Sequence, residues 1–184
     1  MNISSKLVII RGAVGAGKTS VVDSLRDRLG DVSIIDFDAF KRQIDNTKSS
    51  AWRREIAVDT ALYLCERIMQ KRRDVVVDIH SSQINLYEKY VKLAEQHGYE
   101  VLSFMLHPPL EVCIQRAKAR FVPDITYKID ATMIKAYWND AVFIENEIVF
   151  RDAALSADQI ADKVINTVFS NVTQKARLAY STGS

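Results

Sequence analysis

The stretch Gly12-Ala13-Val14-Gly15-Ala16-Gly17-Lys18-Thr19 decides the fold of this 184-residue chain. It fits the pattern G-x-x-x-x-G-K-[ST]. The apolar run Leu7–Ile10 before it is typical of a strand buried on both faces, and the apolar stripe after it is typical of a helix. A strand, a glycine-rich loop and a helix in this order predict a phosphate-binding loop.

Each residue type in this loop has a chemical reason. Glycines let backbone N–H groups wrap closely around phosphate oxygens, and the start of the next helix adds partial positive charge. The lysine reaches the β- and γ-phosphates, and the threonine hydroxyl is placed to bind Mg²⁺. We therefore predict that ATP binds here with Mg²⁺. The predicted nucleotide-binding residues are Gly12, Ala13, Val14, Gly15, Ala16, Gly17, Lys18, Thr19 and Ser20.

Strand and helix patterns alternate along the rest of the chain. Short apolar runs predict further strands at 32–35, 75–77, 101–106 and 148–150. The alternation predicts an α/β fold of three layers, in which a five-stranded parallel sheet has helices on both faces. We expect one domain over residues 1–171 and a loose tail over 172–184.

Composition excludes several classes of protein. A net charge of +2 and a hydrophobic content of 48% are ordinary for a soluble globular protein. No apolar run is long enough to span a membrane, and the first residues do not resemble a signal peptide, so we expect a cytoplasmic protein without a membrane partner. Cys65 and Cys113 are predicted to be buried thiols, not a disulfide or a metal site.

Carboxylates follow two of the predicted strands. An extended chain would place the side chains of Asp36 and Asp38 on the same side. One of them could accept a proton from an attacking hydroxyl and the other could order the waters of Mg²⁺. The alternative is that Asp38 caps a helix that begins near Ala39. Asp78 follows the run Val75–Val77 and is expected to touch Mg²⁺ directly or through water.

Basic residues form two further candidate features. Arg116 and Arg120 are four residues apart, so both project from one face of a predicted helix. As a lid hinged at 121–124 they would stabilise the transferred phosphoryl group; the alternative is an ordinary basic helix surface. Between Lys41 and Arg73 there are nine Lys or Arg and four Asp or Glu. That segment is either a solvated helix surface or a basic wall that faces an anionic substrate.

A phosphate-binding loop alone does not select a reaction. A GTPase should have D-x-x-G after its third strand, but here that strand leads into Asp78-Ile79-His80-Ser81, which has no glycine, and N-K-x-D is absent. The chain is also short for AAA-type ATPases with helical lid domains. A nucleotide-switched binding protein stays as an alternative, although the expected base-reading motif is absent. The paired carboxylates, the carboxylate after the third strand and the arginines favour an ATP-dependent kinase that phosphorylates a hydroxyl.

Together these residues resemble the P-loop kinase group that includes shikimate kinase, chloramphenicol phosphotransferase, zeta-type toxins and polynucleotide kinase. The resemblance covers most of residues 6–170. It implies a strand order of 2-3-1-4-5, Asp38 as the catalytic base and Asp36 close to Mg²⁺. It also implies that adenine lies between the arginine-bearing helix and residues 151–154, and that Lys41 stands where polynucleotide kinases have an arginine for the substrate phosphate.

Candidate site residues follow from these patterns. The catalytic candidates are Lys18, Asp38, Arg116 and Arg120, with Arg116 also at the nucleotide. The metal candidates are Thr19, Asp36 and Asp78, and the candidates for binding the acceptor are Asp38, Lys41, Arg42, Arg54 and His80. The preferred acceptor is a small molecule, such as a metabolite, nucleoside or antibiotic. The alternative is the 5′-hydroxyl of a nucleic acid, and the patterns predict no oligomeric state.

Overall fold

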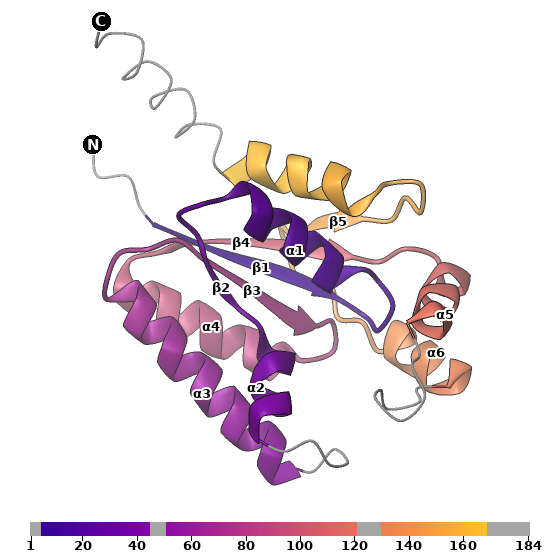
Figure 1. Ribbon diagram of the computed structural model, residues 1–184, viewed down its shortest axis with the longest axis horizontal. Helices are drawn as coiled ribbons and strands as arrows, with labels where there is room; N and C mark the ends of the chain where they lie inside the picture. The colour runs from indigo at the N-terminus through magenta and orange to yellow at the C-terminus, as the bar shows by residue number, and fades with distance from the viewer. Residues whose placement is uncertain (1–4, 45–50, 121–129, 169–184) are drawn as a thin grey trace, which may run out of the picture.

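A parallel sheet lies between two layers of helices in the computed structural model, which describes residues 5–44, 51–120 and 130–168 (Figure 1). The strands are β1 (Lys6–Gly12), β2 (Ser33–Ile35), β3 (Val75–His80), β4 (Glu100–Leu106) and β5 (Ile148–Phe150). All neighbouring strands are parallel, and their order is β2-β3-β1-β4-β5. The predicted three-layer fold and strand order are confirmed.

Helices connect the strands and cover both faces of the sheet. They are α1 (Lys18–Arg28), α2 (Phe37–Ile44), α3 (Ala51–Met69), α4 (Ile84–His97), α5 (Leu110–Ala119) and α6 (Ala131–Asn139), with a last helix over 157–168. In the described part of the chain, no helix is both long enough and apolar enough to cross a membrane. The predicted hinge at 121–124 and tail at 172–184 lie outside the described residues.

The apolar residues form one core on each face of the sheet. Val8 and Ile10 of β1 pack on the side of α1 and the last helix, whereas Leu7 and Ile9 pack on the side of α3 and α4. All four side chains are fully buried because β1 is the central strand, with a neighbour on each side and helices above and below. This position explains the continuous apolar run, since successive side chains of a strand point to opposite faces.

The third strand is longer than its apolar run predicted. Pairing with β1 does not stop at Val77 but continues to His80, which lies opposite Gly12. The reason is that buried Ile79 maintains the two-residue alternation while β1 supplies the hydrogen bonds. Asp78 is therefore inside β3 and not at its tip. Asp78 and His80 point to the face of the sheet that α1 covers.

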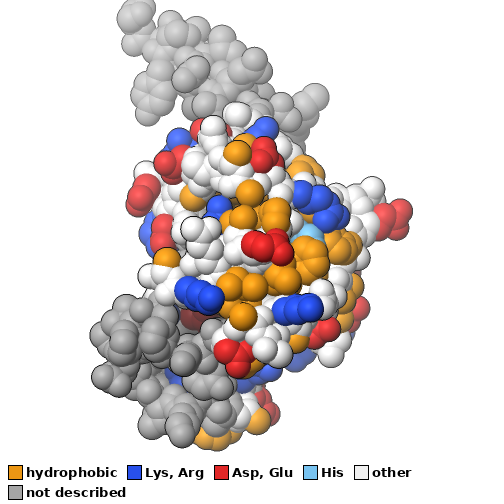
Figure 2. Space-filling model, turned by 90° about the vertical axis from the view of Figure 1, so that its right-hand side faces the viewer, with side chains coloured by type: hydrophobic (Ala, Val, Ile, Leu, Met, Phe, Trp, Pro, Cys, Tyr) orange, Lys and Arg blue, Asp and Glu red, His pale blue; other side chains and the backbone are white. Residues whose placement is uncertain are grey.

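The carboxyl ends of the strands meet at one edge of the sheet. β3 points toward this edge in Figure 1, and α5 and α6 lie beyond it. Figure 2 looks onto this side of the molecule, where hydrophobic side chains form a band with basic side chains to either side of it. Ligands of open parallel sheets bind at this edge, so the functional site is sought here.

Candidate functional site

The loop between β1 and α1 depends on glycine at two positions. Gly15 and Gly17 have φ angles of +78° and +104°, a region that side chains disfavour. A Cβ atom on Gly15 would lie 2.2 Å from the carbonyl oxygen of Cys113, so the loop packs tightly on the backbone of α5. Gly17 is the N-cap of α1 and brings no side chain to its first N–H groups. Those groups are available to an anion.

Lys18 is the first residue of α1 and faces two carboxylates. Its Nζ donates to the carbonyl oxygen of Ala13 at 3.3 Å, across the loop. Burial lowers the pKa of Lys18, while the charges of Asp78 and Asp38 raise it. Thr19 follows Lys18 in the first turn of α1, where its side chain is exposed. A lysine side chain and an exposed hydroxyl therefore lie together at the start of this helix.

Asp78 lies close enough to Asp36 and Asp38 for their charges to act on it. Burial raises its pKa to about 6; the charge of Lys18 lowers it, and the charges of Asp38 and Asp36 raise it further. A bound divalent cation would relieve this repulsion. Among the described residues no three His, Cys, Asp or Glu side chains come close enough to hold a metal alone. The donor set fits Mg²⁺, which is usually held by one or two carboxylates together with substrate phosphates.

The expectation that Asp36 and Asp38 extend side by side is wrong. Helix α2 begins at Phe37, and Asp36 Oδ1 accepts a hydrogen bond of 2.9 Å from the backbone N–H of Ala39. Asp36 is therefore the capping residue of α2, and the alternative that Asp38 caps the helix is also wrong. The physical cause is that the first N–H groups of a helix need acceptors, which an aspartate just before it supplies. Asp38 lies in the first helical turn.

Basic side chains of α2 pair with both carboxylates. The Lys41 ammonium contacts Asp38 Oδ1 and lies 4.6 Å from the centre of the Phe37 ring. Arg42 Nη2 lies 3.5 Å from Asp36 Oδ2. Burial raises the pKa of Asp38, but the charge and hydrogen bond of Lys41 outweigh it, so the pKa is lowered. Asp38 is accordingly a carboxylate at neutral pH, with a lysine as its partner.

His80 presents an N–H donor without a partner. Its Nδ1 accepts from the backbone N–H of Ser82 at 3.3 Å and lies 2.9 Å from the Ser82 hydroxyl, so we assign the ring hydrogen to Nε2. Nε2 is buried and has no hydrogen-bond partner among the described residues. Burial, followed by the charges of Lys18 and Arg54, lowers the pKa of His80 to about 4. The Tyr137 ring of α6 meets the neutral imidazole edge-on, with 5.0 Å between ring centres.

The two predicted arginines lie at the end of α5. Helix α5 starts at Leu110, directly behind Pro109, which places residue 116 in its last turn and residue 120 at its C-cap. Arg116 Nη1 donates to the carbonyl oxygen of Ala16 at 3.2 Å. Arg120 is close enough that its charge acts on the pKa of Lys18, after burial and the two carboxylates. Both arginines therefore lie near the phosphate-binding loop.

The basic segment over 41–73 does not form one wall. Arg72 donates to the His97 carbonyl oxygen at 2.6 Å, and Arg73 lies 2.8 Å from Asp31. Both precede β3, at the edge of the sheet opposite the phosphate-binding loop. The basic residues that remain for the carboxyl edge are those of α2 and the start of α3, where Arg53 Nε donates to the Lys41 carbonyl oxygen at 2.6 Å.

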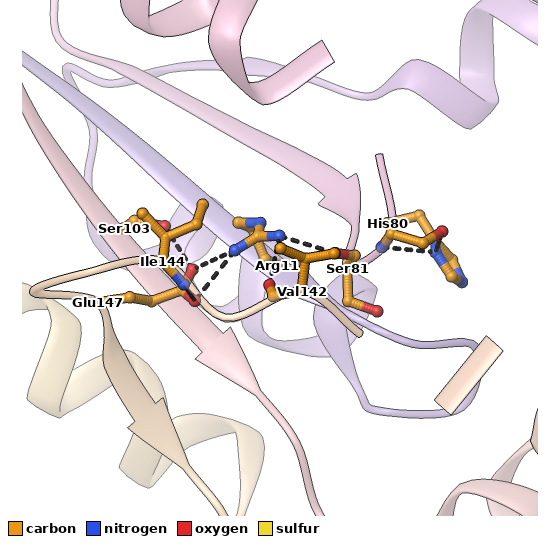
Figure 3. Close-up of polar contacts among 8 residues, drawn as sticks. Arg11, His80, Ser81, Ser103, Val142, Ile144 and Glu147 are labelled. Atoms are coloured by element: carbon orange, nitrogen blue, oxygen red, sulfur yellow. Dashed lines mark hydrogen bonds and ion pairs between the residues drawn. The ribbon is translucent and has the colours of Figure 1, made fainter. Parts of the chain in front are cut away.

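A buried ion pair, which the sequence reasoning missed, links segments next to the candidate site (Figure 3). Arg11 Nη1 lies 2.9 and 3.0 Å from the two carboxylate oxygens of Glu147, and both side chains are fully buried. The Ser103 hydroxyl donates to Glu147 at 2.6 Å. Arg11 Nη2 donates to the carbonyl oxygens of Ser81 and Val142. This pair connects β1, the turn after β3 and the segment after α6.

An aromatic cluster lies beyond β4 and β5, and the sequence reasoning missed it as well. His107 stacks on Trp138 with 4.3 Å between ring centres, and Phe143 meets His107 edge-on at 5.0 Å. The guanidinium of Arg151 lies 4.9 Å from the centre of the Phe143 ring. Residues 151–154, where adenine is predicted, thus begin beside an exposed aromatic ring. A lone arginine after a strand gave no signal of this contact.

Comparisons with known proteins place this geometry in a family. Residues 7–137 match the family AAA_33, which is described as an AAA domain. The chain belongs to this family. The match begins in β1 and ends in α6, so it includes the phosphate-binding loop, both carboxylate positions and α5. The length of the chain disfavours AAA-type ATPases that have an additional helical lid domain, but not membership of this family. No curated protein sequence matches the chain.

Solved structures share the fold of this AAA domain at low sequence identity. The Deinococcus radiodurans tunicamycin resistance protein is 18% identical over 90% of this chain and 96% of its own, with a TM-score of 0.65. Shikimate kinase from Acinetobacter baumannii, in complex with shikimate, is 19% identical over 91% and 94%, with a TM-score of 0.56. A chain of the Pnkp1/Rnl/Hen1 RNA repair complex is 17% identical over 76% and 45%, with a TM-score of 0.67. The predicted resemblance to the P-loop kinase group is confirmed.

Proposed function

We propose that this AAA domain is a kinase that transfers the γ-phosphoryl group of ATP to a hydroxyl of a small molecule. The observation that carries the proposal is that Asp78 of β3 and Asp38 of α2 both act on Lys18 of the phosphate-binding loop. A phosphate site with one carboxylate for a metal and another for a base beside it suits phosphoryl transfer. The likeness to a shikimate kinase supports a small hydroxyl compound as acceptor.

The nucleotide would be held by the loop and the start of α1. Backbone N–H groups of residues 12–20 would surround the phosphates, with Lys18 at the β- and γ-phosphates. Thr19, Asp78 and Asp36 would hold Mg²⁺, which when bound neutralises phosphate charge. Since Asp36 already caps α2 through Oδ1, only its Oδ2 is free to turn toward a metal-bound water, and Arg42 would have to release it.

In the transfer step, an oxygen–phosphorus bond forms and another breaks. The acceptor hydroxyl gives its proton to Asp38 while its oxygen bonds to the γ-phosphorus. The bond from the γ-phosphorus to the β–γ bridging oxygen breaks, and ADP leaves with that electron pair. Arg116 and Arg120 would balance the charge on the transferred group. Lys41, Arg42, Arg54 and His80 would contact the acceptor.

The test is ATP turnover by the purified chain with Mg²⁺ and a panel of hydroxyl compounds. We expect ADP release that depends on an acceptor and yields a phosphorylated product. Asp38→Asn should lower transfer by about 100-fold or more while MgADP binding stays within a few-fold of wild type. Asp23→Asn, on the exposed side of α1, is the matched control and should turn over normally. Unchanged turnover in Asp38→Asn would remove Asp38 as the base.

A 5′-hydroxyl of a nucleic acid is the second candidate acceptor. Two observations favour it: the basic residues of α2 and early α3, and the fold likeness to a chain of an RNA repair complex. Acceptor binding that weakens steeply with salt would support a nucleic acid, because counterions are released from each contacted phosphate. MgATP binding without turnover on any acceptor would instead favour a nucleotide-switched binding protein.

A further inference from the structure

A groove with only basic charges adjoins the candidate site. It has a volume of about 380 Å³ and lies between the first half of α3 and the start of α4. Arg54 and Lys89 line it, together with polar side chains and three apolar ones, and it contains no carboxylate. A second groove farther along the same helices also includes Lys89, but Asp59 and Glu66 line it too. Of these two grooves, only the first carries an unbalanced positive charge.

The groove lies close to His80. Ser82 lines the groove, and its backbone N–H holds Nδ1 of His80, which leaves the buried Nε2–H without a partner among the described residues. Arg54, on the opposite wall, is close enough that its charge acts on His80, after burial and Lys18. The groove therefore begins at the turn after β3, at the same edge of the sheet as the phosphate-binding loop.

The start of α4 adds backbone donors to the same groove. Gln83 is the N-cap of this 14-residue helix, and its side chain makes no capping hydrogen bond. Gln83 and the next three residues all line the groove. The first N–H groups of a helix have no partner within the helix, and with the helix dipole they favour an anion. Two cations and open N–H groups therefore line a groove that has no carboxylate.

We propose that this groove binds a phosphate group that the acceptor already carries. On this proposal, which rests on the proposed kinase function, the acceptor is a phosphorylated hydroxyl compound. Its hydroxyl lies over Asp38 and Asp78, and its phosphate lies between Arg54 and Lys89. Phosphate suits this donor set because it offers several strong acceptor oxygens to cations and helix N–H groups.

Inorganic phosphate is the probe that tests the groove. The ¹⁵N-labelled full chain is first saturated with Mg²⁺ and AMP-PNP, which fills the phosphate-binding loop up to the γ position, and phosphate is then titrated. We expect saturable NMR shifts at amides 84–86 and at the His80 imidazole. Arg54→Gln and Lys89→Gln should each raise the phosphate Kd by about tenfold, as expected for one charge-assisted contact. Lys92→Gln, on the same helix but outside this groove, is the matched control and should leave the Kd unchanged.

Two results would contradict phosphate binding in the groove. One is that the NMR shifts are confined to the phosphate-binding loop, and the other is that neither Arg54→Gln nor Lys89→Gln changes the phosphate Kd. Competition then identifies the source of the phosphate. Displacement by a sugar monophosphate points to a small metabolite, and displacement by a 5′-hydroxyl dinucleotide points to a nucleic-acid end. If neither compound displaces the phosphate, the groove does not bind the phosphate of an acceptor. If AMP-PNP leaves the amides of residues 15–19 unshifted, the proposed kinase function fails, whereas the phosphate titration still tests the groove.

Discussion

The buried pair of Arg11 and Glu147 makes the sharpest prediction about stability. Both side chains are fully buried, so replacing Arg11 with methionine would leave the Glu147 carboxylate in the core without its cation. Removing one partner of a buried pair costs about 3 to 5 kcal/mol. Arg11 also donates at 2.7 and 2.9 Å to two backbone carbonyl oxygens, which would lose their donor at about 1 kcal/mol each. We expect Arg11→Met to destabilise the ligand-free chain by about 5 to 7 kcal/mol.

A double substitution separates the unpaired charge from the lost hydrogen bonds. Glu147→Leu in the Arg11→Met background removes the stranded carboxylate, so most of the charge penalty should disappear. The carbonyl oxygens of Ser81 and Val142 stay without a donor, and the Ser103 hydroxyl loses its acceptor, so we expect the double variant to remain about 3 kcal/mol below wild type. The two substitutions should therefore be far from additive, as for residues in contact.

Urea denaturation followed by far-UV circular dichroism measures these differences. The exposed pair Arg26 and Asp23 on α1 is the control: its side chains are about half exposed, and Arg26→Met should change stability by no more than about 0.5 kcal/mol. If Arg11→Met lowers the stability by no more than Arg26→Met does, the buried ion pair does not stabilise the protein. A double variant as unstable as the sum of the two singles would refute the stranded charge as the cause.

Three further predictions concern the phosphate-binding edge. Asp78→Asn should stabilise the ligand-free protein at pH 8 by about 2 to 3 kcal/mol in urea denaturation, because the folded-state pKa of about 6 lies above the unfolded value of 3.8. This gain should fall below about 1 kcal/mol near pH 4, where Asp78 is protonated in the folded state and partly ionised in the unfolded state. Turnover should be lost, and a gain independent of pH would contradict the burial argument. Gly15→Ala should lower stability by about 2 kcal/mol and MgADP affinity by at least about tenfold in calorimetry. The reason is that Gly15 has a φ of +78° and that a Cβ atom there would meet the Cys113 carbonyl oxygen. The control Gly30→Ala, which has open space around it, should change neither. Lys18→Ala should weaken MgADP binding or turnover by about 100-fold, and normal values for both would overturn the proposed nucleotide site.

Local patterns made much of the fold predictable. The motif from Gly12 to Thr19 needs only neighbouring residues, because its glycines and lysine act within one loop. Apolar runs located all five strands, since strands buried on both faces leave a continuous signal. The end of β3 was less clear because Asp78 and His80 interrupt the run. Their polarity reflects the site at the edge of the sheet and not the end of the strand.

Contacts between distant segments could not be predicted in the same way. Arg11 and Glu147 are 136 residues apart, and each alone resembles an ordinary surface charge. The start of α2 was missed for a different reason, because Asp36 fits a helix cap and a catalytic pair equally well in sequence. The basic groove depends on Arg54 and Lys89 meeting across two helices. Side chains that meet only through the tertiary fold leave no periodic signal.

The pairing of carboxylates with lysine and arginine on α2 has a consequence for the proposed chemistry. In the ligand-free conformation, Lys41 contacts Asp38 and Arg42 lies beside Asp36, so both carboxylates already have a cation. A base that accepts a proton must first lose such a partner, because the cation lowers its pKa. An acceptor that carries its own negative charge would attract Lys41 and free Asp38, whereas water brings no charge to do so. The proposed phosphorylated acceptor and low hydrolysis of ATP in its absence therefore follow from the same arrangement of charges.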